Sequence, residues 1–148
     1  IARRIMICAS EDVGNADPMA LTVAVSAAQA AERIGMPESA IILSQAVTYI
    51  ASAPKSNSAV NAITAAQQAV RQYNTTVPVH LRDAHYRGAK DLGHGTGYKY
   101  AHDYPGHYVK QQYLPDEIKD ARFYEPGDLG YEKNIKEYLR KIRGSVKE

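Results

Sequence analysis

The sequence predicts a mainly α protein, in which an antiparallel helical bundle is followed by an irregular Tyr/His/Gly-rich segment and a C-terminal helix. Small apolar residues recur at helical spacing through residues 1–73, and proline or glycine interrupts them at short intervals. Residues 93–115 instead combine tyrosine, histidine, glycine and lysine. We expect a single region over 1–148, with an irregular arm at 74–115 and short and terminal helices over 116–143.

The first two predicted helices are separated by a Gly-Asn pair. Helical spacing begins at Ile1 with no capping residue before it, so we expect residue 1 to lie inside or near a longer helix of a larger protein. Gly14 ends this helix because it tolerates left-handed backbone angles. Asp17-Pro18 begins a second helix that extends to about Ile34. Its predicted packing stripe consists of alanines: Ala20, Ala24, Ala27 and Ala31.

Two further helices complete the predicted bundle. Pro37 begins the third and Pro54 ends it. Its predicted buried face comprises Ile42, Ala46, Tyr49, Ile50 and Ala53. Ser56 or Asn57 caps a fourth helix that fades at residues 73–74. That helix places Val60, Ile63, Gln67 and Val70 at helical spacing. Short turns between long helices predict antiparallel neighbours.

The remaining elements are predicted to be short except for the last. Residues 80–91 allow a short helix, and Tyr98, Tyr100, His102 and Tyr104 alternate as in a short strand or an extended arm. Pro115-Asp116-Glu117 begins a short helix that extends to about Phe123, and residues 125–128 form a turn. A final helix begins at Tyr131 and groups five apolar residues on one face: Tyr131, Ile135, Tyr138, Leu139 and Ile142.

Composition excludes several classes of function. The net charge of +2 arises wholly in residues 80–148, and it is too small for a dedicated nucleic-acid clamp. The single cysteine, Cys8, cannot form an internal disulfide, which fits a reducing, cytoplasmic setting. No apolar run reaches the length of about 18 residues that a membrane span needs, so no membrane partner is expected.

No catalytic, cofactor-binding or metal-binding residue is predicted. All five histidines lie in one stretch, at positions 80, 85, 94, 102 and 107, but neither close pair has the spacing of a helical zinc motif. We expect them to hydrogen-bond loop backbone, and a small metal-dependent enzyme is the alternative. The stretch from Gly93 to Lys99 resembles a phosphate loop but lacks the Gly-Lys-Ser/Thr ending of that motif.

Tyrosines and lysines alternate in the arm and suggest a nucleic-acid contact. The candidate residues are Lys90, Tyr98, Lys99, Tyr100 and Lys110. Aromatic rings beside cations can stack on unpaired bases. The interpretation that we prefer at this point is structural: tyrosines bury their rings to hold the loop while their hydroxyls reach polar partners.

Several motifs together carry a resemblance to a known family. They are Ala9-Ser-Glu-Asp-Val-Gly14 with Asp17-Pro18, Ala53-Pro-Lys-Ser-Asn57, Pro78-Val-His-Leu-Arg82, Gly97-Tyr-Lys-Tyr-Ala-His-Asp103 and Gln112-Tyr-Leu-Pro115. In this order the set resembles the C-terminal region of the replication-associated recombination protein A (MgsA/RarA) family. Members are AAA+ ATPases related to clamp-loader subunits.

The resemblance implies a helical, clamp-loader-collar-like region that holds ATPase modules together as a homotetramer. It also implies a parent protein that acts in DNA replication, recombination and repair at stalled forks. Such a parent would be a DNA-dependent ATPase that uses ATP and Mg²⁺ and that binds DNA and single-strand-binding protein. The family's Walker motifs lie upstream and are absent here, so no catalytic residue is carried over. We therefore expect an oligomerisation domain, with a DNA-contacting module over residues 86–113 as the alternative.

Overall fold

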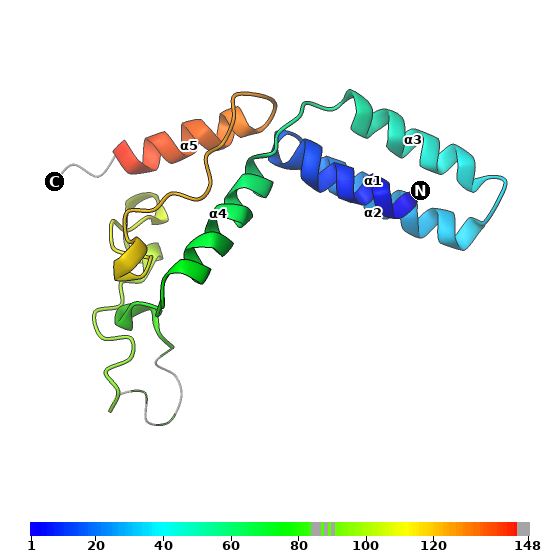
Figure 1. Cartoon of the computed structure of the whole chain (residues 1–148). Helices are drawn as coiled ribbons and strands as arrows, with labels where there is room; N and C mark the ends of the chain where they lie inside the picture. Colours follow the sequence, from blue (N-terminus) through cyan, green and yellow to red (C-terminus); the bar gives the residue numbers. More distant parts are fainter. Residues whose placement is uncertain (84–86, 88, 90, 145–148) are drawn as a thin grey trace. The chain divides into compact units, whose positions relative to one another are not determined.

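All regular structure in the described part of the chain is helical (Figure 1). This computed structural model describes residues 1–83, 87, 89 and 91–144. The helices are α1 (Ala2–Cys8), α2 (Met19–Ile34), α3 (Ser39–Ser52), α4 (Ser58–Gln72) and α5 (Glu132–Gly144). No strand occurs among those residues, and the predicted mainly α class, with an irregular segment before a C-terminal helix, is confirmed.

The chain divides into two compact units. The first unit comprises residues 1–64 and 123–138, and the second comprises residues 65–122 and the chain from Leu139 onward. The segment from Phe123 to Tyr138 therefore packs with the N-terminal helices, although 58 residues, 65–122, separate it from them in the sequence.

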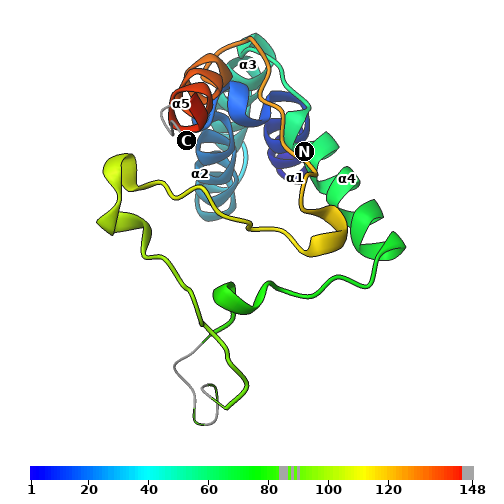
Figure 2. The same ribbon diagram turned by 90° about the vertical axis from the view of Figure 1, so that its left-hand side faces the viewer.

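The core of the first unit lies among α1, α2 and α3 (Figures 1 and 2). Most of its buried positions are alanines, including Ala20, Ala24 and Ala27 of the predicted α2 stripe. Because these side chains are small, the helices approach closely and leave little room for large apolar residues. Ile5, Val13 and Ile50 complete the core, while several other large apolar residues of this unit are exposed.

The first helix continues beyond α1 as a π-helix, Ala9–Val13, and a 3₁₀ turn, Gly14–Ala16. In an α-helix, residues four positions apart lie slightly more than one full turn from each other. In a π-helix, which has more residues per turn, they lie slightly less than one full turn apart. Combining both types keeps Ile5, Ala9 and Val13 buried on one face. The sequence pattern predicted a single helix here and did not reveal this change of pitch.

Side chains satisfy the ends of several helices. The Asp17 carboxylate accepts a hydrogen bond from the Met19 amide at 3.0 Å, as expected for a capping residue. The Ser56 hydroxyl accepts one from the Ser58 amide at 3.2 Å, at the start of α4. At the end of α3, the Lys55 ammonium donates to the carbonyls of Ile50 and Ala51 at 2.9 and 3.2 Å. Lys55 thus stabilises the C-terminus of α3.

Several apolar residues at the predicted helical spacing are exposed, and so is Tyr49, which was expected on the buried face of α3. On α4, Ile63 and Val70 are 56% and 62% exposed. On or beside α5, the same is true of Tyr131 and Tyr138, at 51% and 56%. The helical period identified α4 and α5 correctly, but it cannot show how much of an apolar helix face is covered by a neighbouring element.

The arm of the second unit contains only short turns within its described part. A short helix was expected over 80–91. The structure has one 3₁₀ turn at its start, Val79–Leu81, and residues 84–86, 88 and 90 lie outside the described residues. For residues 98–104 a short strand or an extended arm was expected; no strand occurs there, and a 3₁₀ turn, Ala101–Asp103, lies between the extended residues Tyr100 and Tyr104. The short helix expected to begin after Pro115 is present as a single 3₁₀ turn, Asp116–Ile118, and does not extend to Phe123. A segment this short forms too few backbone hydrogen bonds to offset the free energy of nucleating an α-helix.

Candidate functional site

A buried carboxylate organises the first unit. Glu132 opens α5 and is fully buried. Its two oxygens accept hydrogen bonds from the Ser56 hydroxyl at 2.7 Å, the Gly127 amide at 2.7 Å and the Tyr124 hydroxyl at 2.9 Å, and also from the Ser58 hydroxyl. We call these five residues the Glu132 network. It joins the start of α4 to the turn that precedes α5.

The hydrogen bonds of this network favour the charged form of Glu132. Burial raises the pKa of the carboxyl, but the hydrogen bonds from Ser58, Ser56, Gly127 and Tyr124 outweigh it, so the pKa lies below its ordinary value. Burial is the main cause that raises the pKa of Tyr124; the hydrogen bond from Asn15 lowers it, and the hydrogen bond to Glu132 and the charge of that residue raise it. The Asn15 amide donates to the Tyr124 hydroxyl at 3.2 Å, which extends the network to the first helix.

Two glycines allow backbone segments to meet beside this network. Gly130 has φ +55°, and an added Cβ would lie 2.0 Å from the carbonyl oxygen of Ala16. At that contact the Tyr131 amide donates to the same oxygen at 2.8 Å. Gly14 has φ +52°, and its Cβ would lie 3.0 Å from the carbonyl oxygen of Ser56. The linker from α3 to α4 is thus held between the first helix and the segment before α5.

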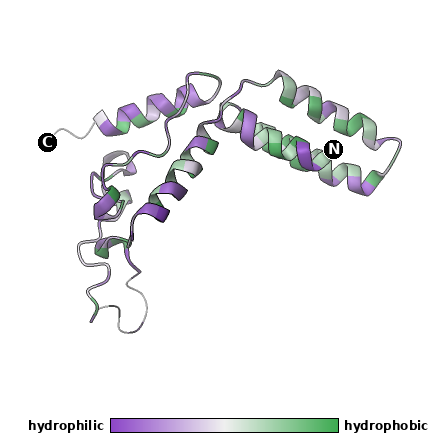
Figure 3. Cartoon of the chain, in the orientation of Figure 1, coloured by the Kyte–Doolittle hydropathy of each residue, from purple (hydrophilic) through white to green (hydrophobic). Residues whose placement is uncertain are grey.

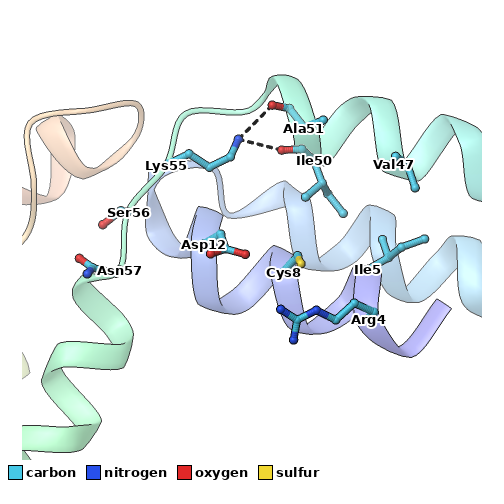
Figure 4. Close-up of a pocket in the computed structure, with 10 residues that line it drawn as sticks. All are labelled: Arg4, Ile5, Cys8, Asp12, Val47, Ile50, Ala51, Lys55, Ser56 and Asn57. Atoms are coloured by element: carbon cyan, nitrogen blue, oxygen red, sulfur yellow. Dashed lines mark hydrogen bonds between the residues drawn. The ribbon is translucent and has the colours of Figure 1, made fainter. Parts of the chain in front are cut away.

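An apolar groove of about 700 Å³ opens between the first helix and α3 (Figure 4). Its floor and walls include Ile5, Cys8, Val47, Ile50 and Ala51. Polar side chains lie at its edges and along the linker: Arg4, Asp12, Lys55, Ser56 and Asn57. Within the first unit, the groove is therefore an apolar surface bordered by charged residues.

A second apolar hollow of about 580 Å³ lies on another side of the first helix. Among its lining residues are Met6, Ile7, Leu21, Val60 and Ile63. Near the turn between α2 and α3, Met36 and Ile41 are 75% and 74% exposed. Hydrophobic residues accordingly run along α1, α2 and α3 (Figure 3), and several of them face solvent. We call the groove and the hollow together the apolar surfaces of the first unit.

The proposed nucleic-acid residues of the arm are exposed wherever the structure describes them. Tyr98 and Tyr100 are 58% and 53% exposed, and Lys99 and Lys110 are exposed as well. Lys90 lies outside the described residues. Tyr113 helps to hold the loop, since its hydroxyl donates to the Val109 carbonyl at 2.9 Å. Tyr98 and Tyr100 are therefore accessible to a partner, although the Tyr100 ring also contacts His102.

The histidines occupy two different settings. One ring nitrogen of His80 lies 2.8 Å from the Gln112 carbonyl, as expected for a histidine that holds loop backbone. His102 contacts His107 with ring centroids 4.8 Å apart. His85 lies outside the description. Among the described residues, no three His, Cys, Asp or Glu side chains group as metal ligands.

Sequence reasoning missed Glu132 entirely. Its only signal is an acidic residue in the first turn of the last helix, which is usual on a solvated surface. The serines that bind it, Ser56 and Ser58, precede it by more than seventy positions. Ser56 and Ser58 come to lie against the start of α5 only when the chain folds, so no local sequence pattern could have revealed the contact.

In the part of the chain that the structure describes, no helix is long and apolar enough to cross a membrane. The family model for the MgsA AAA+ ATPase C terminal matches residues 1–143. An uncharacterized AAA domain-containing protein of Mycobacterium tuberculosis is 48% identical over 148 residues, which cover 99% of this chain and 33% of that protein.

Two relatives carry a more specific name. Replication-associated recombination protein A of Bacillus subtilis is 45% identical, with 96% of this chain and 34% of that protein covered. The protein of the same name from Escherichia coli is 43% identical, with 94% and 32% covered. The chain therefore spans about a third of the length of these curated relatives. It belongs to the family of MgsA AAA+ ATPase C-terminal domains.

Proposed function

We propose that this chain is a non-catalytic assembly domain, which holds copies of an AAA+ ATPase together as a homotetramer. The observation that carries the proposal is the pair of apolar surfaces on the first unit. Contiguous exposed apolar surface of this kind is uncommon on monomers and usually marks an interaction site. A second copy of the chain is the occupant expected of an assembly domain.

Family membership supports the inference that this domain is part of a larger protein. The relatives named for replication-associated recombination suggest a parent that acts in DNA replication, recombination and repair. We infer that ATP and Mg²⁺ are bound by an ATPase core outside residues 1–148, and that the parent works in the cytoplasm with DNA and single-strand-binding protein. The assembly domain would set the spacing of these cores.

The α1–α3 groove offers a direct test of assembly. Replacing Val47, which is 45% exposed and lines the groove, with aspartate would place an unpaired charge in an apolar interface. We expect wild-type protein to have the mass of an oligomer by light scattering and Val47→Asp to dissociate at the same concentration. At a concentration low enough for both proteins to be monomeric, the free energy of unfolding of Val47→Asp should differ from that of wild type by less than about 0.5 kcal/mol, as for other surface substitutions.

The matched control introduces the same side chain elsewhere on α3. Gln45 is exposed and does not line the groove, so Gln45→Asp should leave the mass unchanged. A wild-type chain that stays monomeric at high micromolar concentration would contradict the proposal. Equal dissociation of both variants would show that charge on α3, rather than the groove, matters.

The second candidate function is a nucleic-acid contact made by the arm. Exposure of Tyr98, Lys99, Tyr100 and Lys110 supports it over a purely structural role for these side chains. Lys90 completes the proposed set. The contact is compatible with assembly, because it uses the arm of the second unit and leaves the apolar surfaces of the first unit to other copies.

A further inference from the structure

Three aromatic rings of the arm form a continuous series. Tyr100 and His102 have ring centroids 5.0 Å apart and planes inclined by 44°. His102 and His107 follow at 4.8 Å and 51°. These separations are typical of interacting aromatic rings. We call Tyr100, His102 and His107 the aromatic ladder.

The backbone has left-handed angles at His107, which carries the last ring of the ladder. Among the described residues, His107 is the one residue other than glycine with positive φ, at +53°. Gly106 before it has φ +68°, so two successive residues are left-handed. Such a conformation is unfavourable for a histidine and persists where the surroundings or a function require it. Here it turns the chain back so that His107 meets His102.

The ladder is exposed, although aromatic rings usually cluster to leave water. Tyr100 is 53% exposed, and His102 and His107 are exposed too. Lys99 precedes the ladder and Lys110 follows it, while Asp103 is the acidic residue within 96–113. Successive exposed rings beside cations suit flat, anionic partners. Unpaired nucleic-acid bases on a phosphate backbone have this chemistry, since every base presents a π-face.

We propose that the aromatic ladder is a stacking platform for the unpaired bases of single-stranded DNA, a proposal that rests on the second candidate function. Bases stack on Tyr100, His102 and His107, and Lys99 and Lys110 contact phosphates. Duplex DNA binds more weakly, because its base faces are covered by neighbouring pairs. Two phosphate contacts predict a modest salt dependence, with a slope of log K against log salt of about −1.4.

The test measures fluorescence anisotropy of a labelled oligo-dT of about 16 nucleotides, a length within the range that a single binding module covers. The full 148-residue chain is used, with a duplex of equal length as a second probe. Tyr100→Ala and His107→Asn should each raise the Kd for the single strand about fivefold or more. Asparagine tolerates left-handed angles, so His107→Asn removes the ring and keeps the turn.

Ring-retaining variants separate stacking from folding. Tyr100→Phe and His102→Phe keep an aromatic face and should bind within about twofold of wild type, because stacking needs no hydroxyl or imidazole nitrogen. Tyr138→Ala, which removes an equally exposed tyrosine from α5, should bind as wild type does.

Each further outcome decides a separate claim. If Lys99→Glu with Lys110→Glu weakens binding while Tyr100→Ala and His107→Asn do not, the ladder proposal is overturned and the charged contact stands. Absence of wild-type binding to single strands overturns both. A change of oligomeric mass in Tyr100→Ala, with unchanged anisotropy, would assign the ladder to protein contacts and overturn the proposal.

Discussion

Glu132→Ala is expected to lower the free energy of unfolding by about 3–5 kcal/mol. The substitution removes the acceptor of four hydrogen bonds and leaves their donors unpaired: the hydroxyls of Ser56, Ser58 and Tyr124 and the amide of Gly127. Buried donors without partners cost more than the net value of the bonds lost. Such a loss is a large part of the stability of an ordinary domain.

Urea unfolding followed by circular dichroism measures this effect. Protein concentration must be fixed, because assembly would add to the stability of every variant. Glu132→Gln keeps the size of the side chain and one acceptor oxygen, so it should lose less, about 1–2 kcal/mol. Equal stability of wild type and Glu132→Ala would show that the network contributes nothing to the fold.

The same network predicts acid sensitivity. The pKa of Glu132 is lower in the folded chain than its ordinary value of 4.5, so its contribution is complete above the unfolded pKa and is lost as pH falls through the folded pKa. The melting temperature of wild type should therefore fall more steeply below about pH 4.5 than that of Glu132→Gln, which cannot titrate there. Parallel profiles for the two proteins would exclude Glu132 as a source of acid sensitivity.

Gly130→Ala is expected to be the other severe substitution, at about 3 kcal/mol or more. Its Cβ would lie 2.0 Å from the Ala16 carbonyl oxygen and 2.7 Å from the ring of Pro54, so the backbone must move. That movement would break the hydrogen bond from the Tyr131 amide to Ala16. The left-handed φ of +55° adds about 1–2 kcal/mol for any residue with a Cβ.

Gly106→Ala is the control for the backbone angle alone. Gly106 also has positive φ, at +68°, but nothing lies within 4 Å of an added Cβ. Thermal unfolding should therefore shift far less for Gly106→Ala than for Gly130→Ala. Similar losses in both would assign the cost to the backbone angle and leave no role for the close approach to Ala16.

Glu132 and Gly130 bear on function because they hold the linker between α3 and α4, which borders the groove. Ser56, which binds Glu132, and Lys55 beside it both line the α1–α3 groove. Gly130 brings the segment before α5 against Ala16 and Pro54. We therefore expect variants that loosen this contact to weaken assembly as well, although neither residue lines the groove itself.

Local signals were sufficient to predict helices α1 to α5 from the sequence. Asp17 was expected to cap α2 and does so, and the alanine stripe of that helix is buried at Ala20, Ala24 and Ala27. Such features depend on residues within a few positions of one another. The arm was harder, because Gly- and Tyr-rich sequence has no period: it forms no strand over residues 98–104, and the short helix expected after Pro115 is only a 3₁₀ turn.

The sequence by itself determined the helical class, most helix boundaries and the family, because capping, periodicity and motif order are properties of neighbouring residues. The tertiary structure alone decided that Glu132 is buried against Ser56 and Ser58, that Ile63 and Val70 face solvent, and that His107 meets His102. The physical reason is that burial and long-range hydrogen bonds depend on which segments meet, and a residue's own neighbours in the chain do not specify that.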